Sequence, residues 1–319
     1  MPCVPRPGEK LSRSIDDYPE GIILPVDKPY RWTSADVIRK VKYAAIHHFG
    51  KKNLKVGHAG TLDPLATGVL LVCIGNACKM ADNLQRHDKE YVAGVAFGAT
   101  TPSYDLEKDI DRFFPFDHIT EDSVRAVLPS FLGEQEQIAP LFSAKSVDGI
   151  RAYEIARKMY HHHAPAEATA NPDSAEIYFS GRGPKNQIPA TSFLRHPTHV
   201  ETASFDDVAA IILQRNIIRI DAIELLSFGD GSAASVAAAA SESGASGRIN
   251  VTDTSQYGFP VATIRIACSK GTYIRAFARD LGEALGSGAH LQSLVRTKTG
   301  DFRVETALSL GEALSCLAK

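Results

Sequence analysis

Residues 56–75 of the chain read VGHAGTLDPLATGVLLVCIG, and this stretch guides the interpretation of the whole sequence. Its closely spaced glycines indicate tight bends or close backbone approaches. Residues 69–74 are apolar throughout and are followed by a glycine, which predicts a buried strand. Asp63 lies just before this strand, and Pro64 biases its backbone toward extended geometry. An acid on such a stiff loop suits a nucleophile, although an Asp that completes a turn would give the same pattern.

The composition is that of a soluble globular protein. The 319 residues are 44% hydrophobic and 23% charged, enough for one large domain or two ordinary ones. No apolar run approaches the roughly 18 residues that span a bilayer, so we expect no membrane segment. The polar, proline-containing first 20 residues differ from a signal peptide. Five cysteines without a CxxC pair favour a reduced, cytoplasmic protein and argue against a zinc site or a disulfide scaffold.

The charges are unevenly distributed around a net charge of −2. Residues 38–60 carry six basic side chains and no acidic one, whereas residues 104–136 carry nine acids and three bases. A basic block that leads into the Asp63 loop could attract a phosphate backbone. A solvated helix face would carry the same charges, so this pattern alone leaves both interpretations open.

The rest of the sequence predicts mixed helices and strands. We expect strands over 21–26, 89–98, 216–228 and 260–269, and helices over 149–157 and after N-caps at Thr33, Thr120 and Thr272. The strand over 216–228 should turn Ile218, Ile220 and Ala222 toward one face. Because no regular βαβ repeat appears, the pattern favours the α+β class.

The domain organisation is inferred from the segments that lack a hydrophobic periodicity. We expect a flexible tail over 1–19 and one folded domain over 20–315, with insertions at about 161–202 and 229–256. The triple histidine at 161–163 falls in the first insertion without a cysteine nearby, so we predict no metal site there.

Four motifs follow one another along the chain in a fixed order. They are Val26-Asp27-Lys28-Pro29 with Thr33-Ser34, the stretch from Gly57 to Leu70, Lys89-Glu90-Tyr91, and Gly271-Thr272-Tyr273-Ile274-Arg275 with Asp280-Leu281-Gly282 and Gly288-Ala289-His290-Leu291. Together they resemble the bacterial tRNA pseudouridine synthases of the TruB type, which modify the T-loop uridine at position 55 of tRNA. The segment 104–107, YDLE, differs from the sequence that is more common at this position in that family.

The resemblance implies an overall architecture. We expect the pseudouridine synthase fold over 20–315, a mixed and largely antiparallel central sheet flanked by helices, with the catalytic cleft across its middle. Many members add a C-terminal RNA-binding PUA domain. Only 16 residues follow Arg303, fewer than the roughly 40 that a domain needs, so we expect a form without it.

The resemblance also implies the chemistry and the partners. We expect an isomerase without cofactor or metal that acts on the T-stem-loop of tRNA, without a membrane or an obligatory protein partner; the oligomeric state stays open. Asp63 matches the nucleophile and Arg275 the cation that pairs with it, while Asp105 matches a second acid that contacts this arginine. Tyr91 matches the catalytic tyrosine that stacks on the target base, although without the motif it would be assigned as a core aromatic.

Further positions match residues that bind substrate. His58 matches the side chain that fills the space left by the flipped uridine, although a histidine that bonds the loop backbone is the alternative. Leu294 matches an apolar wall of the pocket, and Tyr273 belongs to the third motif. Lys28 is grouped with these residues, although we expect it to support the catalytic loop.

Two other functions fit the same residues. An RNA-binding protein that helps tRNA to fold, with catalysis secondary, would use the same basic block and base-flipping loop. A related synthase could act on another RNA or depend on a guide partner.

Overall fold

The computed structural model describes residues 1–147, 149–163, 205–230 and 249–318. The chain divides into two compact units, one formed by residues 1–135 with 218–319 and the other by residues 136–217. Within these described ranges, no helix is both long and apolar enough to cross a membrane. All the residues proposed below as functional lie in the first unit.

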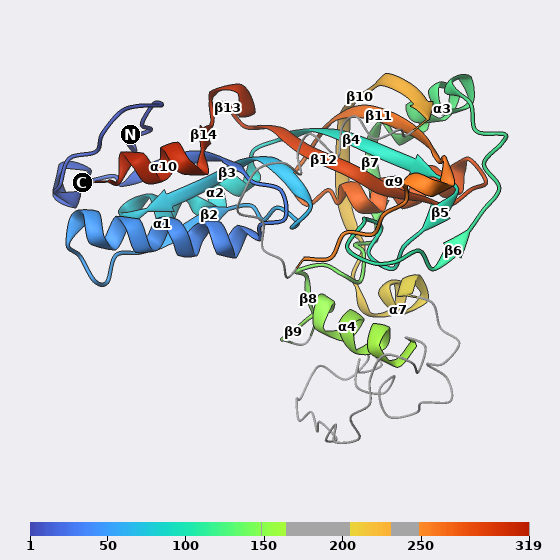
Figure 1. The fold of residues 1–319 in the computed structure, drawn as a ribbon, viewed down its shortest axis with the longest axis horizontal. Helices are drawn as coiled ribbons and strands as arrows, with labels where there is room; N and C mark the ends of the chain where they lie inside the picture. Colours follow the sequence, from blue (N-terminus) through green and yellow to red (C-terminus); the bar gives the residue numbers. More distant parts are fainter. Residues whose placement is uncertain (148, 164–204, 231–248, 319) are drawn as a thin grey trace. The chain divides into compact units, whose positions relative to one another are not determined.

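The first unit is built on one mixed sheet (Figure 1). Its strand order is β14-β1-β3-β12-β4-β11-β10-β7. The pairs β1–β14 and β3–β12 run parallel, whereas β1–β3, β2–β3, β4–β12, β4–β11, β10–β11 and β12–β13 are antiparallel. Helices flank this sheet, which confirms the expected α+β class with a largely antiparallel sheet. The strands are β1 Ile22–Lys28, β2 Val56–Ala59, β3 Ala66–Ile74, β4 Lys89–Phe97, β7 Gly133–Gln137, β10 Asn216–Asp230, β11 Pro260–Cys268, β12 Ala289–Thr299, β13 Phe302–Arg303 and β14 Leu308–Ser309.

Strand β3 is buried on both faces, as its uninterrupted apolar sequence predicts. Leu70 and Val72 belong to the main hydrophobic core, whereas Val69 and Leu71 belong to a second core on the opposite face. This alternation follows from the two-residue period of a strand. The strand that follows the Asp63 loop is therefore fixed by packing from both sides.

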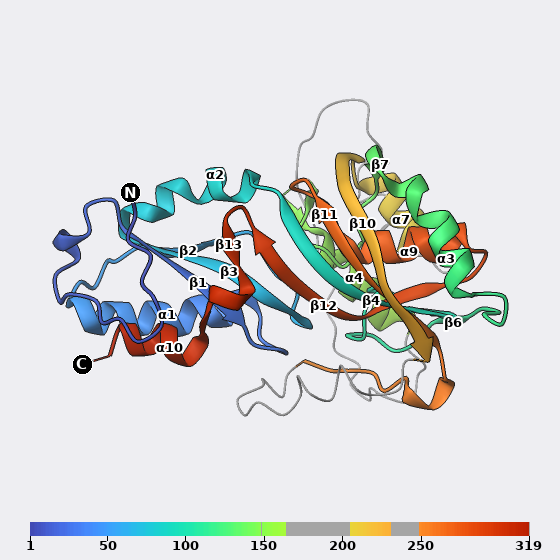
Figure 2. The same ribbon diagram turned by 90° about the horizontal axis from the view of Figure 1, so that it is seen from above.

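Helices cover the two faces of this part of the sheet (Figure 2). On one side lie α1, Ser34–Phe49, and α10, Leu310–Cys316; on the other lies α2, Ala81–Arg86. As predicted, Thr33 caps α1, and it forms a reciprocal capping box with Asp36. Val37, Val41 and Ala45 recur at the helical period and are all fully buried. This packing fixes the start of α1 beside the Asp63 loop.

Strand β10 corrects one prediction about its buried face. Ile218 and Ile220 are buried as expected, but Ala222 is exposed. The pairing of β10 with β11 shifts register between Ile220 and Ala222, and this irregularity turns the following residues to the other face. On β11 the alternate residues are buried, in keeping with the two-residue period of a strand: Ala262, Ile264, Ile266 and Cys268.

One predicted helix also begins elsewhere. The N-cap position of α9, Ile274–Ala284, is Tyr273, without a side-chain capping bond, and the Thr272 hydroxyl donates to the Ser269 carbonyl. Thr120 caps α3, Glu121–Val127, as predicted, but this helix passes into a 3-10 turn, Leu128–Phe131, that contains Pro129. Proline lacks the amide donor that would continue the helix.

The first 19 residues differ from the predicted flexible tail. Cys3 pairs with Ile22 beside β1, Leu11 is buried, and the Leu11 amide donates to the Cys316 carbonyl. Both predicted insertions fall mainly on residues 164–204 and 231–248, outside the described residues. Of the second, residues 249–256 are described and belong to the first unit, where they bond to the loop 104–109, as shown below.

In its described residues, the second unit contains a short hairpin and two helices. The hairpin pairs β8, Ser146–Val147, with β9, Ile150–Arg151, and α4 spans Ala152–His163. The predicted helix over 149–157 therefore starts three residues late, since the hairpin occupies its first positions. The other helix is α7, Phe205–Ile212, whose Phe205 ring lies 5.7 Å from that of Phe142.

A substitution at Gly68 can test the close approach between β3 and β12. Its φ of 97° suits glycine, and a Cβ added there would lie 2.2 Å from the backbone carbonyl oxygen of Arg296. We expect Gly68→Ala to lower the free energy of unfolding by about 3 kcal/mol or more, measured by chemical denaturation. Gly57→Ala is the matched control, because nothing lies within 4 Å of its added Cβ; it should change stability by less than about 1 kcal/mol. Equal midpoints for the two variants would contradict the close approach.

Candidate active site

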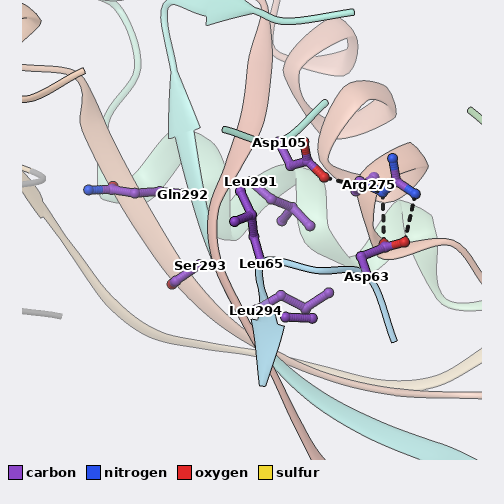
Figure 3. Close-up of a pocket in the computed structure, with 9 residues that line it drawn as sticks. Asp63, Leu65, Asp105, Arg275, Leu291, Gln292, Ser293 and Leu294 are labelled. Carbon is purple, nitrogen blue, oxygen red and sulfur yellow. Dashed lines mark hydrogen bonds and ion pairs between the residues drawn. The ribbon is translucent and has the colours of Figure 1, made fainter. Parts of the chain in front are cut away.

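Asp63 and Arg275, 212 residues apart in sequence, form a two-pronged ion pair (Figure 3). The Arg275 Nε donates to Asp63 Oδ2 and Nη2 donates to Oδ1, both at 2.9 Å. The Arg275 side chain is 6% exposed and that of Asp63 is 36% exposed. Paired parallel hydrogen bonds of this kind fix both the distance and the plane of a carboxylate. The pair therefore holds a partly open carboxylate in one orientation.

Arg275 lies in the first turn of α9 and is surrounded by acceptors. Its Nη1 donates to the Ser103 carbonyl at 3.0 Å, and its Nε lies 3.7 Å from Asp105 Oδ2. Burial by itself would lower the pKa of Arg275, but Asp63, Asp105 and Glu107 outweigh it and raise that pKa. The guanidinium is therefore a permanent charge that needs these carboxylates to be stable in the interior.

Asp105 is held rigidly by the loop that carries it. Its Oδ1 accepts from the Ser103 hydroxyl at 2.6 Å and from the Glu107 amide at 3.0 Å, and its own carbonyl accepts from the Thr101 hydroxyl. Tyr104 adopts a left-handed φ of 56°, which turns the chain at this point. Burial raises the pKa of Asp105, with Arg275 acting in the opposite direction.

The open side of Asp63 faces a pocket at the parallel junction of β3 and β12 (Figure 3). These two strands lie in the middle of the sheet order. The lining combines the three charged side chains with short polar and apolar ones: Asp63, Leu65, Ala66, Asp105, Arg275, Leu291, Gln292, Ser293 and Leu294. The structure thus brings together four of the predicted site residues, Asp63, Asp105, Arg275 and Leu294.

Lys28 supports the Asp63 loop through its buried ammonium group. It is fully buried, and its Nζ donates to the carbonyls of Pro29, Trp32 and Pro64 at 2.9, 2.6 and 3.1 Å. Burial lowers the pKa of Lys28 to about 7, while the charge of Asp63 raises it. All three acceptors are backbone carbonyls, so these contacts hold the loop, and Lys28 is not among the residues that line the pocket.

Two residues without a predicted role hold the same loop. Arg296, 1% exposed, donates from Nε to the Val69 carbonyl at 2.7 Å and from Nη2 to the Gly60 carbonyl at 3.1 Å. The Ser34 hydroxyl exchanges hydrogen bonds with the amide and carbonyl of Leu62. One sequence signal could have identified Arg296: it lies two residues after Leu294 in a strand, hence on the same, inward face.

Tyr91 lies on β4, opposite Arg296 of β12. It is 9% exposed and is not among the residues that line the pocket. Burial raises the pKa of its phenol, and Arg296 opposes this effect. The charge of Asp63 also raises the pKa of Tyr91. The phenol is a neutral hydrogen-bonding group in a mostly apolar environment.

His58 lies on β2, opposite Val72 of β3. Burial lowers the pKa of its imidazole, and the charge of Arg296 acts in the same direction, so the ring is neutral at pH 7. Its Nδ1 is buried without a hydrogen-bond partner in the part of the chain that the structure describes. The alternative role of His58 is a hydrogen bond to the loop backbone, and Nδ1 makes no such bond within the described residues.

Tyr273, half-buried at the N-cap of α9, comes two residues before Arg275. It is not among the residues that line the pocket. Over the described ranges, no group of three or more histidine, cysteine, aspartate or glutamate side chains could hold a metal ion. The side chains of the triple histidine at 161–163 lie outside the described set.

Comparison with known proteins decides the family. A model described as TruB family pseudouridylate synthase (N terminal domain) matches residues 47–171, and one described as tRNA pseudouridylate synthase B C-terminal domain matches residues 275–319. The tRNA pseudouridine synthase B of Phocaeicola vulgatus is 40% identical over 294 residues, 92% of each chain. The chain belongs to the TruB family.

Other TruB relatives cover similar shares of the chain. The tRNA pseudouridine synthase B of Flavobacterium johnsoniae is 35% identical and covers 92% of this chain and 95% of its own. That of Deinococcus deserti is 33% identical, covering 90% and 77%. In its fold, the chain is similar to one in a crystal structure of a Cbf5-Nop10-Gar1 complex, with a TM-score of 0.50 at 21% identity. That match covers 98% of this chain and 58% of the other.

The region matched by the TruB C-terminal model begins at Arg275 itself. In the structure, this region includes most of α9 and all of β12, the strand at the centre of the sheet. It therefore contributes Arg275, Arg296 and one wall of the pocket to the first unit, while Asp63 and Asp105 lie in the region matched by the N-terminal model.

Glu107 adds a titratable group behind this site. Burial raises its pKa to about 7, Asp105 and Asp63 add to the shift, and Arg275 and Lys108 oppose it. Between the unfolded value near 4.5 and about pH 7, the folded state therefore binds more protons than the unfolded state. The free energy of unfolding should fall as the pH rises through this window.

Glu107→Gln removes this titration. We expect the stability of the unchanged protein relative to the variant to fall by about 1–3 kcal/mol between pH 5 and pH 8, measured by urea denaturation at each pH. Glu121→Gln, at a half-exposed position on α3, is the control and should show a nearly constant difference. A constant difference for Glu107→Gln would mean that its carboxyl titrates alike in both states.

Proposed function

We propose that this chain converts the T-loop uridine of tRNA, position 55, to pseudouridine, with Asp63 as the nucleophile. The observation that carries the proposal is the Asp63 carboxylate itself. It is partly open to a pocket and is gripped by the buried Arg275 in a chain of the TruB family. The names of the relatives support tRNA as the substrate.

The chemistry needs one carboxylate and a site that excludes water. Pseudouridine forms when the N1–C1′ bond breaks, the base turns, and C5 bonds to C1′. C5 loses its proton and N1 gains one, so that the product is an isomer of uridine. Glycosidases use a second carboxylate to deliver or activate water, but here water would capture the sugar and release the base. Leu65, Leu291 and Leu294 give the pocket apolar walls that favour the exclusion of water.

Arg275 and Asp105 orient the nucleophile. The Arg275 guanidinium forms an ion pair with the Asp63 carboxylate and a second, longer one with the Asp105 carboxylate. In this arrangement Asp105 is a positioning residue, because it is 4% exposed and acts through Arg275. Preorganised charges of this kind cost no reorganisation when the reaction occurs.

Tyr91 and His58 complete the proposed roles. The raised pKa of Tyr91 keeps its phenol protonated at neutral pH, in the form that packs against a base and donates a hydrogen bond. His58 would fill the space left by the flipped uridine, since extrusion of a base costs a few kcal/mol of lost stacking. Its neutral ring and its unpartnered Nδ1 suit contact with bases.

RNA affinity would come from the basic block over residues 38–60. Its six cationic side chains are all exposed, on α1 and in the loop that follows: Arg39, Lys40, Lys42, Lys51, Lys52 and Lys55. Exposed lysines and arginines bind the phosphate backbone and release counterions, so binding should weaken steeply with salt. We further propose that Leu294 and Tyr273 contact the substrate nucleotide.

Asp63→Asn tests the nucleophile. The amide keeps the shape of the carboxylate but lacks its nucleophilicity, so we expect no detectable pseudouridine in a T-stem-loop RNA. The readout is tritium release from uridine labelled at C5, because C5 loses its proton in the reaction. RNA affinity, measured by filter binding, should stay within about threefold of that of the unchanged protein, since phosphates dominate binding.

The same experiment tests the nucleophile assignment and the need for a guide partner. Product at the unchanged rate in Asp63→Asn would refute the nucleophile assignment. If the unchanged protein acts on bare T-stem-loop RNA, no guide partner is required. Mapping of pseudouridine at nucleotide resolution in total RNA would reveal any other substrate.

Arg275→Lys tests the two-pronged contact. A lysine keeps the positive charge but cannot donate two parallel hydrogen bonds to Asp63. We expect kcat to fall by about 100-fold or more, because misplacement of a reacting group by about 1 Å has this effect. Thermal unfolding should show a folded protein, and near-normal turnover would show that the pairing is not required.

A further inference from the structure

Arg31 occupies a position that lowers stability in two ways. Its φ is 61°, in the left-handed region that favours glycine. Its Nε is buried and has no hydrogen-bond partner within the described ranges of the chain. An unpartnered buried donor and a strained backbone both oppose folding. A residue of this kind is a candidate for a role beyond local stability.

The Arg31 side chain reaches a segment that is remote in sequence. Its Nη2 donates to the Ile249 carbonyl at 2.7 Å, across 218 positions of the chain. The segment that begins there bonds in turn to the loop that carries Asp105. The Thr252 amide donates to the Leu106 carbonyl at 2.8 Å, and the Thr252 hydroxyl donates to Asp109 Oδ1 at 2.9 Å.

The turn that carries Arg31 is also joined to the Asp63 loop. The Lys28 ammonium donates both to the Trp32 carbonyl, one residue after Arg31, and to the Pro64 carbonyl, one residue after Asp63. On the other side, Asp105 contacts Arg275, which holds Asp63. These contacts close a ring around the ion pair. Its members, in order, are the turn 29–32, the segment 249–252, the loop 104–109, Arg275 and the Asp63 loop.

We propose that Arg31 is a positioning residue of the active site. It fastens residues 249–252, which bond to the loop 104–109 through Thr252, to the turn 29–32, and it thereby fixes Asp105 and Arg275 against Asp63. The catalytic consequence rests on the proposed function, whereas the fastening itself does not. The described end of the second predicted insertion thus becomes part of the structure behind the nucleophile. Loss of the hydrogen bond from Arg31 to Ile249 would open the ring at the contact that joins the residues farthest apart in sequence.

Arg31→Gly is a selective test, because glycine suits φ 61° and the change also removes the unpartnered Nε. Thermal stability should therefore be unchanged or higher. We expect kcat for T-stem-loop RNA to fall by about tenfold or more while KM stays within about twofold, as loss of geometry rather than of binding predicts. Hydrogen exchange, read by mass spectrometry, should become faster at the amides of Thr252 and Glu107.

Arg125→Gln is the control, because Arg125 is an exposed arginine on α3 whose ion pair is with Glu121. It should leave kcat and both exchange rates within about twofold of the unchanged protein. Unchanged kcat in Arg31→Gly, or a raised KM with unchanged kcat, would overturn the proposal, and the second result would mean that Arg31 binds RNA. Unchanged exchange at residues 249–253 would overturn the fastening whatever the activity. If the unchanged protein forms no pseudouridine, the proposed function fails, and exchange alone decides the fastening.

Discussion

The structure depends on the charge of Arg275. A guanidinium that is 6% exposed is stable only if anions and carbonyls take up its charge and its donors. Asp63, Asp105 and the Ser103 carbonyl do so, and they come from two loops far from α9 in the sequence. Burial of one cation therefore forces these loops together. The carboxylate that it orients is the one that remains open to the pocket.

A second set of contacts holds the Asp63 loop by its backbone. Lys28, Ser34 and Arg296 are all buried, and each bonds to a carbonyl or an amide between Gly60 and Val69. Side chains that bond to the backbone fix the path of the loop without using the Asp63 carboxylate. The two sets of contacts act on different groups. Arg275 orients the Asp63 carboxylate, and Lys28, Ser34 and Arg296 fix the backbone of the loop that carries it. This division suits a reaction in which a base must turn within the site.

The sequence by itself determined the local structure and the acid at its centre. The apolar run over 69–74, the cap at Thr33 and the alternation over 260–268 each depend on near neighbours in the chain, and the structure contains all three. The motif around Asp63 also indicated the family, because its spacing of glycines, acid and proline is specific. Such features are readable because hydrophobic periodicity and capping act over a few residues.

Only the tertiary structure decided how distant residues meet. Arg296 and Arg31 bond to carbonyls more than 200 positions away. Strand period places Arg296 on the inward face, but no local pattern encodes the partner of either arginine. Ala222 is exposed because of a register shift against β11, which depends on the partner strand. Residues 1–19 are ordered by contacts with β1 and the C-terminal helix, although their own sequence has no core-like period. The physical reason is the same in each case: long-range contacts are selected by the packing of the whole sheet, whereas sequence patterns report neighbours along the chain.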